Sequence, residues 1–246
     1  MKKGPEEFSI LFQSAADIPP PHAFHALIKI GAGNDGFASI EFRQEYTDRD
    51  EIPKEEIEAE GFSLEDDFEW QGKLPDFWLE ETQKLVEATE WKSATNSQVL
   101  LAEPGTENWL SPVQEKKWIR FTEELIQACL EEGGKELPME MAFGELLKNN
   151  FFETISLEWR FAKKEIHATI KGGTQASFTG RDWDDAEEQL KTWMEDEAAE
   201  ADLYQLPKFK GYYWLVNGEV WLPEKNKLRG RVWEWVNENG KKEKLN

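Results

Sequence analysis

Two runs of carboxylates are the side chains in this sequence with the clearest potential for chemistry. The first run is Asp48, Asp50 and Glu51, and the second, 14 residues further on, is Glu65, Asp66, Asp67 and Glu69. Carboxylate oxygens are the ligands that calcium and magnesium prefer, and a carboxyl pair with one member kept protonated can hydrolyse a bond. One hypothesis is therefore a carboxylate- or metal-dependent hydrolase with its site near Asp48, Asp50, Asp66 and Asp67.

The spacing of these runs favours a simpler interpretation. The stretch from Asp48 to Pro53 lacks the glycine and the closing bidentate glutamate that a calcium-binding loop requires. Runs of charge are in most proteins solvated faces of the fold. We therefore predict no metal site, no cofactor and no catalytic residue, and we favour a protein that is not an enzyme over one that is.

Other reactive residue types stand in patterns typical of structural roles. His22 and His25 lie three apart in a predicted strand, so their side chains would point to opposite faces. Cys129 falls on the apolar stripe of a predicted helix, where burial makes a thiol inert. The segment from Gly31 to Gly36 matches the glycine pattern of dinucleotide-binding loops, but a strand follows it instead of the helix that would hold the pyrophosphate.

The excess negative charge of the chain is concentrated in two segments. The 246 residues include 50 Asp and Glu against 29 Lys and Arg, a formal net charge of −21. Residues 45–90 carry a net charge of −13 and residues 181–202 carry −8, so the remainder is neutral. Charge placed in this way predicts surfaces that meet a positive partner, because complementary charge accelerates association and sets specificity.

Composition also argues against several classes of partner. A nucleic-acid backbone would be repelled by this charge, so we predict no nucleic-acid partner. No apolar run approaches the roughly 18 residues that span a bilayer, so we predict no membrane partner. A single cysteine rules out an internal disulfide and agrees with a reducing compartment, which predicts a cytoplasmic protein.

Apolar periodicity predicts an α+β fold, with mainly antiparallel sheets and packed amphipathic helices. Alternating residues predict a hairpin within residues 22–46, two strands within 155–171 and a third strand through Phe178. Prolines and an N-cap aspartate predict helices that begin at Pro53, Pro75, Pro112, Pro138 and Asp182.

The C-terminal tail is predicted to end in strands. Asn217–Gly218 and Asn239–Gly240 are hairpin signals. A strand through Trp233 and Trp235 would place both rings on one face, and tryptophan is a common anchor of protein interfaces. The tail is also rich in bases, so an alternative is a homo-oligomer in which the tail of one copy docks on the acidic helix of another.

Residues 93–112 are rich in Gly, Pro and Asn and predict a connecting segment. They would separate an N-terminal α+β half, residues 1–92, from a C-terminal α+β half, residues 113–246, and a single domain stays an alternative. A hairpin followed by an acidic helical segment occurs within residues 22–90 and again within 153–200, about 130 residues apart. The sequence therefore leads to the hypothesis of two related hairpin-plus-helix halves.

The leading functional hypothesis is a non-enzymatic acidic module that binds a basic protein partner. The predicted binding residues combine carboxylates with aromatic rings, which supply the desolvated anchors of an interface. They are Phe62, Glu65, Asp66, Asp67, Phe68, Trp70, Trp233 and Trp235. In composition alone, the chain is similar to the acidic immunity or antitoxin proteins that neutralise basic nuclease toxins. Mimicry of nucleic-acid charge is a variant of this hypothesis.

Overall fold

The chain divides into two compact units, unit 1 (Met1–Glu136) and unit 2 (Leu137–Asn246). The computed structural model describes the backbone of residues 7–94, 96–102, 106, 108–147, 150–171, 175–179, 181–198, 211–216, 220–223, 228–239 and 241–242. Within that backbone, it describes the side chains that lie in residues 7–145, 154–171, 183–192 and 230–238.

Unit 1 is built on a seven-stranded antiparallel sheet with the strand order β4-β3-β2-β1-β6-β7-β5. The strands are β1 (Glu7–Gln13), β2 (Phe24–Ala32), β3 (Phe37–Tyr46), β4 (Phe68–Pro75), β5 (Trp91–Ser93), β6 (Val99–Ala102) and β7 (Trp109–Pro112). The predicted hairpin is β2–β3, in which Phe24 pairs with Tyr46 and Ala32 with Ala38.

Two helices, α2 (Phe77–Glu87) and α3 (Glu115–Glu132), cover one face of this sheet. Along β3 every second residue is buried, as a strand with one covered face requires. Trp78 of α2 and Trp118 of α3 are fully buried, and both rings contact Phe121, at centroid distances of 5.8 and 6.0 Å. The core of unit 1 therefore lies between one face of the sheet and these two helices.

Unit 2 repeats this plan with a second seven-stranded antiparallel sheet, in the order β13-β12-β8-β9-β10-β11-β14. The strands are β8 (Met139–Leu147), β9 (Asn150–Arg160), β10 (Glu165–Ile170), β11 (Gln175–Thr179), β12 (Gly211–Val216), β13 (Val220–Pro223) and β14 (Lys241–Lys242). The helices α4 (Arg181–Ala198) and α5 (Leu228–Asn239) contribute Trp183, Leu190, Val232 and Val236 to the core.

The two units share the order of six of their seven strands and of two helices, whereas the seventh strand lies beside the hairpin in unit 1 (β5) and beside the meander in unit 2 (β14). Each begins with a four-stranded meander, β1–β4 or β8–β11, and continues with a helix, α2 or α4. A hairpin then adds beside the first strand of the meander, and a final helix follows it. The predicted α+β fold with antiparallel sheets is confirmed, and the hypothesis of two hairpin-plus-helix halves anticipates part of this shared order.

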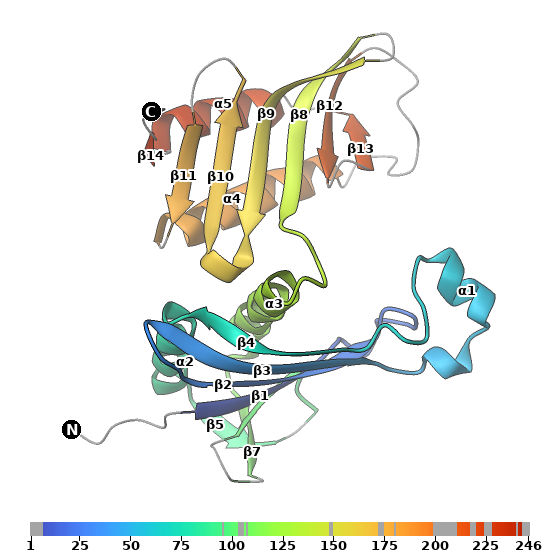
Figure 1. Cartoon of the computed structure of the whole chain (residues 1–246), viewed down its shortest axis with the longest axis vertical. Helices are drawn as coiled ribbons and strands as arrows, with labels where there is room; N and C mark the ends of the chain where they lie inside the picture. The colour runs from blue at the N-terminus through green and yellow to red at the C-terminus, as the bar shows by residue number, and fades with distance from the viewer. Residues whose placement is uncertain are drawn as a thin grey trace. The chain divides into compact units, whose positions relative to one another are not determined.

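The units differ between the third and fourth strands of the meander. In unit 2 only residues 171–174 connect β10 to β11, whereas residues 47–67 connect β3 to β4 in unit 1. We call residues 47–67 the acidic insertion. It contains a 3-10 turn, η1 (Arg49–Glu51), and the short helix α1 (Lys54–Ala59), and it lies at the end of the sheet away from α2 (Figure 1).

Two predicted elements are wrong, for the same physical reason. The helix expected from Pro138 is strand β8, and the strand expected through Trp233 and Trp235 is helix α5. In both places two apolar residues that face the core lie four apart, Met139 and Phe143 or Val232 and Val236, and that spacing fits a helix and a strand equally. Pairing of β8 with β9 and β12 decides the first case.

The boundary between the two units does not lie in residues 93–112, where the sequence predicts a connecting segment. Strands β6 and β7 lie in that segment, and β6 pairs with β1 at the centre of the first sheet. Helix α3 packs on the same sheet, so the chain divides after Glu136. The hairpin predicted around Asn217–Gly218 has its strands β12 and β13 in place, and the turn itself lies outside the described residues.

Candidate functional site

The acidic insertion concentrates charge that its own bases do not neutralise. It holds ten carboxylates and two bases, Arg49 and Lys54, a net charge of −8. Lys54 forms an ion pair with Glu58 one helical turn away, and Arg49 is buried against Asp66. The insertion therefore presents an excess of carboxylates to solvent, and its internal structure depends on Arg49.

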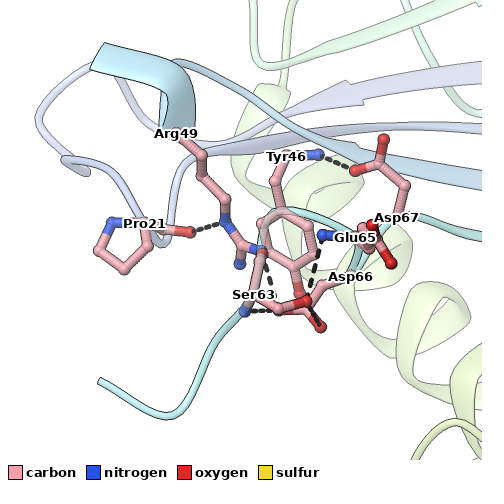
Figure 2. A network of polar contacts seen from close by, with 7 residues as sticks. All are labelled: Pro21, Tyr46, Arg49, Ser63, Glu65, Asp66 and Asp67. Carbon is pink, nitrogen blue, oxygen red and sulfur yellow. Dashed lines mark hydrogen bonds and ion pairs between the residues drawn. The ribbon is translucent and has the colours of Figure 1, made fainter. Parts of the chain in front are cut away.

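Arg49 is a buried clamp that ties the insertion to the rest of unit 1 (Figure 2). Its Nε donates a hydrogen bond to the carbonyl of Pro21 at 2.8 Å. Its Nη1 donates to the carbonyl of Ser63 and to Oδ2 of Asp66, the latter at 2.9 Å. The guanidinium thus joins the approach to β2 with both the start and the end of the insertion, which a planar group with several donors can do and an ammonium cannot.

Two aromatic rings also stack on the guanidinium of Arg49. The Arg49 Cζ lies 3.5 Å from the centroid of Tyr46 and 4.8 Å from that of Phe62. A desolvated cation over an aromatic ring gains energy from the negative face of the ring. Stacking and hydrogen bonding together give the insertion one preferred arrangement, in spite of the mutual repulsion of its carboxylates.

Asp66 acts inside this network as an ionised acceptor. Its carboxylate accepts hydrogen bonds from the backbone N–H and the hydroxyl of Ser63, at 2.7 and 3.0 Å, in addition to the bond from Arg49. Desolvation by burial works to raise the pKa of Asp66, but these hydrogen bonds and the charge of Arg49 outweigh it, so the pKa lies below its ordinary value of 3.8.

The lowered pKa of Asp66 predicts a pH-dependent contribution to stability. The folded state favours the ionised form, so the contribution is complete above pH 3.8 and is lost as the pH falls through the lower pKa of the folded state. We expect Asp66→Asn to reduce the free energy of unfolding at neutral pH, and the gap from wild type to close at strongly acidic pH. Native-state hydrogen exchange of unit 1 across that range measures it, and a gap that does not narrow contradicts the assignment.

Most acids of residues 45–90 are unpaired and face solvent. All of the 17 except Glu45, Asp66 and Glu81 are exposed. Within the described side chains, exposed carboxylates of the insertion without an ion pair are Asp48, Asp50, Glu51, Glu55, Glu56, Glu60, Glu65 and Asp67. The second acidic segment has another setting, because its residues up to Ala198 form α4. There Trp183 and Leu190 face the core, and Asp184, Asp185 and Glu188 lie on the solvated side.

A cavity of about 350 Å³ lies between the insertion, the ends of β2 and β3, and α3. We call it the insertion cavity. One wall is aromatic: His22 packs edge-on against Phe62 at 5.1 Å, and Tyr46 lies 6.1 Å from both Phe62 and Phe24, measured between ring centroids. The aliphatic part of the lining comes from Ile126 and Leu130 of α3.

The polar lining of the insertion cavity contains two amides and two carboxylates, besides His22 and Tyr46 of the aromatic wall. Gln127 donates a hydrogen bond to Glu136 at 2.8 Å, and Glu123 also lines the space. Gln44 is only 5% exposed, and its amide oxygen is buried without a hydrogen-bond partner among the described residues. Burial of an unpaired amide costs free energy, so its presence in this wall calls for an explanation.

The predicted binding residues at this end of unit 1 divide into two groups. Glu65 and Asp67 are exposed, and Asp67 accepts a hydrogen bond from the Tyr46 backbone N–H at 2.9 Å. Phe62 lines the insertion cavity, whereas Phe68 packs against Phe42 and under the end of α3 at Gly133. The structure thus brings Phe62, Asp66 and Asp67 together around Tyr46 and Arg49.

Three predicted aromatic residues lie away from this cluster. Trp70 covers Gly72 on the same strand, where a Cβ would collide with its ring. Trp233 and Trp235 do not share a face, because α5 is a helix and residues two apart diverge there. Trp233 is 49% exposed, while Trp235 packs against the core of unit 2.

The residues proposed for a hydrolase site have other surroundings. Asp48 has a left-handed backbone conformation, with φ of 59°, at the start of η1, and both Asp48 and Asp50 are exposed. Asp66 is bound to Arg49 and Ser63, as described above. In the part of the chain that the structure describes, no group of three or more His, Cys, Asp or Glu side chains is arranged to hold a metal ion.

The remaining reactive residues are accounted for by packing and pairing. His25 interacts with Glu45 at 2.6 Å, on the strand face opposite to the core. His167 interacts with Glu165 at 3.1 Å. Cys129 is fully buried on α3, and desolvation raises the pKa of its thiol, as its place on the apolar stripe predicts.

Sequence reasoning missed Arg49 and Gln44, the two residues that define this site. A signal for each was present. Gln44 continues the buried series Ala38, Ile40 and Phe42 on β3, and a polar residue at a core position needs a partner or a function. Arg49 is a base amid carboxylates, but its contact with Pro21, 28 positions away, cannot be foreseen from spacing.

Comparisons with protein-family models, with curated proteins and with solved structures gave no significant match to this chain. Among the described helices, none is both long and apolar enough to cross a membrane.

Proposed function

We propose that this chain is a non-enzymatic protein-binding module whose acidic insertion engages a basic protein partner. The observation that carries the proposal is the uncompensated charge of the insertion, where both bases are already bound to carboxylates of the same segment. Eight exposed carboxylates then stand without a described ion pair on one short segment. Such a surface raises the rate of encounter with a positive partner and selects against negative ones.

Preorganisation supports the proposal. The Arg49 clamp fixes both ends of the insertion, so the carboxylates are held in place before a partner arrives. A fixed charge pattern binds more tightly than a mobile one, because less conformational entropy is lost on association. The network therefore serves the binding surface and does not itself perform chemistry.

The insertion also offers an apolar contact at its surface. Leu64 is 51% exposed and lies between Ser63 and Glu65, within the segment that Arg49 holds. Interfaces combine a small apolar centre with a polar rim, and a single exposed leucine among carboxylates fits such a centre. A basic nuclease of the kind that acidic immunity proteins neutralise has the charge required of the partner.

Charge reversal in the insertion tests the proposal. We expect the wild-type chain to capture a basic protein from lysate at low salt and to release it at high salt. Glu55→Lys, Glu56→Lys and Glu60→Lys together should abolish this capture, because they reverse three exposed carboxylates that have no described partner. A matched control reverses three exposed carboxylates of unit 1 outside the insertion, Glu87→Lys, Glu90→Lys and Glu132→Lys, and should retain the partner.

The outcomes separate the proposal from its alternatives. Equal loss in both triple variants would mean that net charge, and not the insertion, controls binding. Capture that is insensitive to salt, or no capture at all, would contradict the proposal. If light scattering shows that the captured partner is a second copy of the chain, the self-associating alternative holds instead. A cytoplasmic location belongs to the proposal, in keeping with the single buried cysteine.

A further inference from the structure

The insertion cavity has the composition of a site for an organic cation. Its lining includes the carboxylate of Glu136, whose described partner is the neutral amide of Gln127, and contains neither lysine nor arginine. Arg49 lies close by, but its charge is balanced by Asp66 at 2.9 Å. An anionic ligand such as a phosphate would therefore meet repulsion in this space, whereas a cation would be attracted.

The unpaired amide of Gln44 points to a ligand with hydrogen-bonding groups. Gln44 is 95% buried, lines the cavity and has no partner among the described residues. A buried amide without a partner destabilises the fold, and a ligand that pairs with it recovers that free energy on binding. A methionine of similar shape would avoid the cost, so the glutamine is explained by a bound group that it contacts.

The aromatic wall supplies the third component. Tyr46 and Phe62 line the cavity, and the same two rings already hold the guanidinium of Arg49, at 3.5 and 4.8 Å from their centroids. Aromatic faces bind guanidinium groups by cation–π attraction and planar stacking. The cavity is at the lower end of ligand-pocket volumes, which are about 300–1,000 Å³, so its occupant is one side chain or a molecule of that size.

We infer that the insertion cavity binds the side chain of an arginine, which the basic partner inserts between Gln44, the aromatic wall and Glu136. The guanidinium pairs with the carboxylate of Glu136 and, once rotation of the Gln44 side-chain amide turns its enclosed oxygen toward the cavity, with that oxygen. Its stem packs on Ile126 and Leu130. This inference rests on the proposed function, because it identifies which residue of the partner anchors the complex. Buried arginines of this kind are frequent hot spots of interfaces.

A small probe tests the cavity without the partner. Nα-acetyl-arginine amide is titrated into the full chain, and the backbone amide resonances of Tyr46 and Leu130, which line the cavity and are present in every variant, are followed by NMR. We expect a saturable shift with a dissociation constant on the order of 1 mM, typical of so small a ligand. Nα-acetyl-citrulline amide has the same shape without the charge, and we expect it to bind at least about tenfold more weakly.

Two substitutions establish which groups hold the probe. Gln44→Met should lower the affinity for the probe about tenfold. The melting temperature of this variant should equal or exceed that of the wild type, since the substitution removes an unpaired buried amide. Glu136→Gln should lower the affinity for the probe several-fold. Glu132→Gln, at an exposed position near the same end of α3, should leave that affinity unchanged. Equal binding of the arginine and citrulline probes, no saturable shift, or unchanged binding by Gln44→Met would each overturn the inference.

The captured partner then distinguishes a failure of this inference from a failure of the proposed function. If Gln44→Met weakens the binding of both the probe and the partner, the anchoring role of the cavity is supported. If it weakens the binding of the probe alone, the partner does not insert an arginine into the cavity, while the acidic insertion remains the binding surface. If charge reversal in the insertion leaves the partner bound, the proposed function fails, and the inferred anchor of its complex fails with it.

Discussion

Replacing Arg49 with methionine is expected to lower the free energy of unfolding of unit 1 by about 3 kcal/mol. Arg49 is 4% exposed, and its guanidinium binds the carbonyls of Pro21 and Ser63 and the carboxylate of Asp66. Its removal leaves three acceptors without their donor in a partly buried setting, which costs more than the pair itself contributes. Hydrogen exchange of the β2 and β3 amides measures the loss, because these strands border the insertion.

A double-mutant cycle assigns that loss to the network. Asp66→Asn removes the charge that Arg49 neutralises, so the Arg49→Met and Asp66→Asn double variant should be less destabilised than the sum of the single variants. Arg49→Lys should recover little, because an ammonium cannot reach three acceptors and stack on Tyr46 at the same time. A loss below about 1 kcal/mol for Arg49→Met would show that the clamp does not hold the insertion.

Trp118→Ala is expected to destabilise unit 1 by about 4 kcal/mol, more than any other single change considered for this chain. The side chain is fully buried on α3, its ring lies 5.4 Å from that of Trp91, and its Nε1 donates to Thr89 Oγ1 at 2.9 Å. Its loss leaves a large cavity between α3 and the sheet, and the Thr89 hydroxyl keeps only the hydrogen bond that it donates to the Leu85 carbonyl. Since α3 also carries Glu123 and Ile126, the insertion cavity should lose its shape as well.

Trp233→Ala is the matched control for this prediction. Trp233 is 49% exposed on α5, so the same substitution removes little buried area and should change stability by no more than about 0.5 kcal/mol. Native-state hydrogen exchange reports the two units through their own amides. Equal effects of the two substitutions would contradict the assignment of Trp118 to the core.

Elements whose signals are local could be predicted from the sequence. The hairpin of β2 and β3, the helix after Pro112 with its end at Gly133, and the paired strands around Lys163 follow from periodicity and turn chemistry. Elements that depend on distant partners could not. Strand β1 and the short strands β6 and β7 carry weak patterns, and they become strands by pairing with their neighbours in the sheet.

The candidate site was predicted only in part, for a related reason. Charge counting locates the carboxylates of the insertion, because exposure of acids is the default. It does not reveal that Arg49 reaches Pro21, or that Gln44 faces α3 across a cavity, because these contacts join segments 28 and about 80 positions apart. Apolar residues four apart, as in β8 and α5, were likewise ambiguous until their packing was known.

The rate of association with the captured partner, measured as a function of salt, tests the role of the acidic insertion most directly. We predict that the wild-type rate constant falls steeply as salt is added, and that the triple variant of Glu55, Glu56 and Glu60 associates at least about tenfold more slowly at low salt, with a shallower dependence. The control variant of Glu87, Glu90 and Glu132 should keep most of the wild-type rate and slope. Identical rates and slopes for the two triple variants would contradict the role assigned to the insertion.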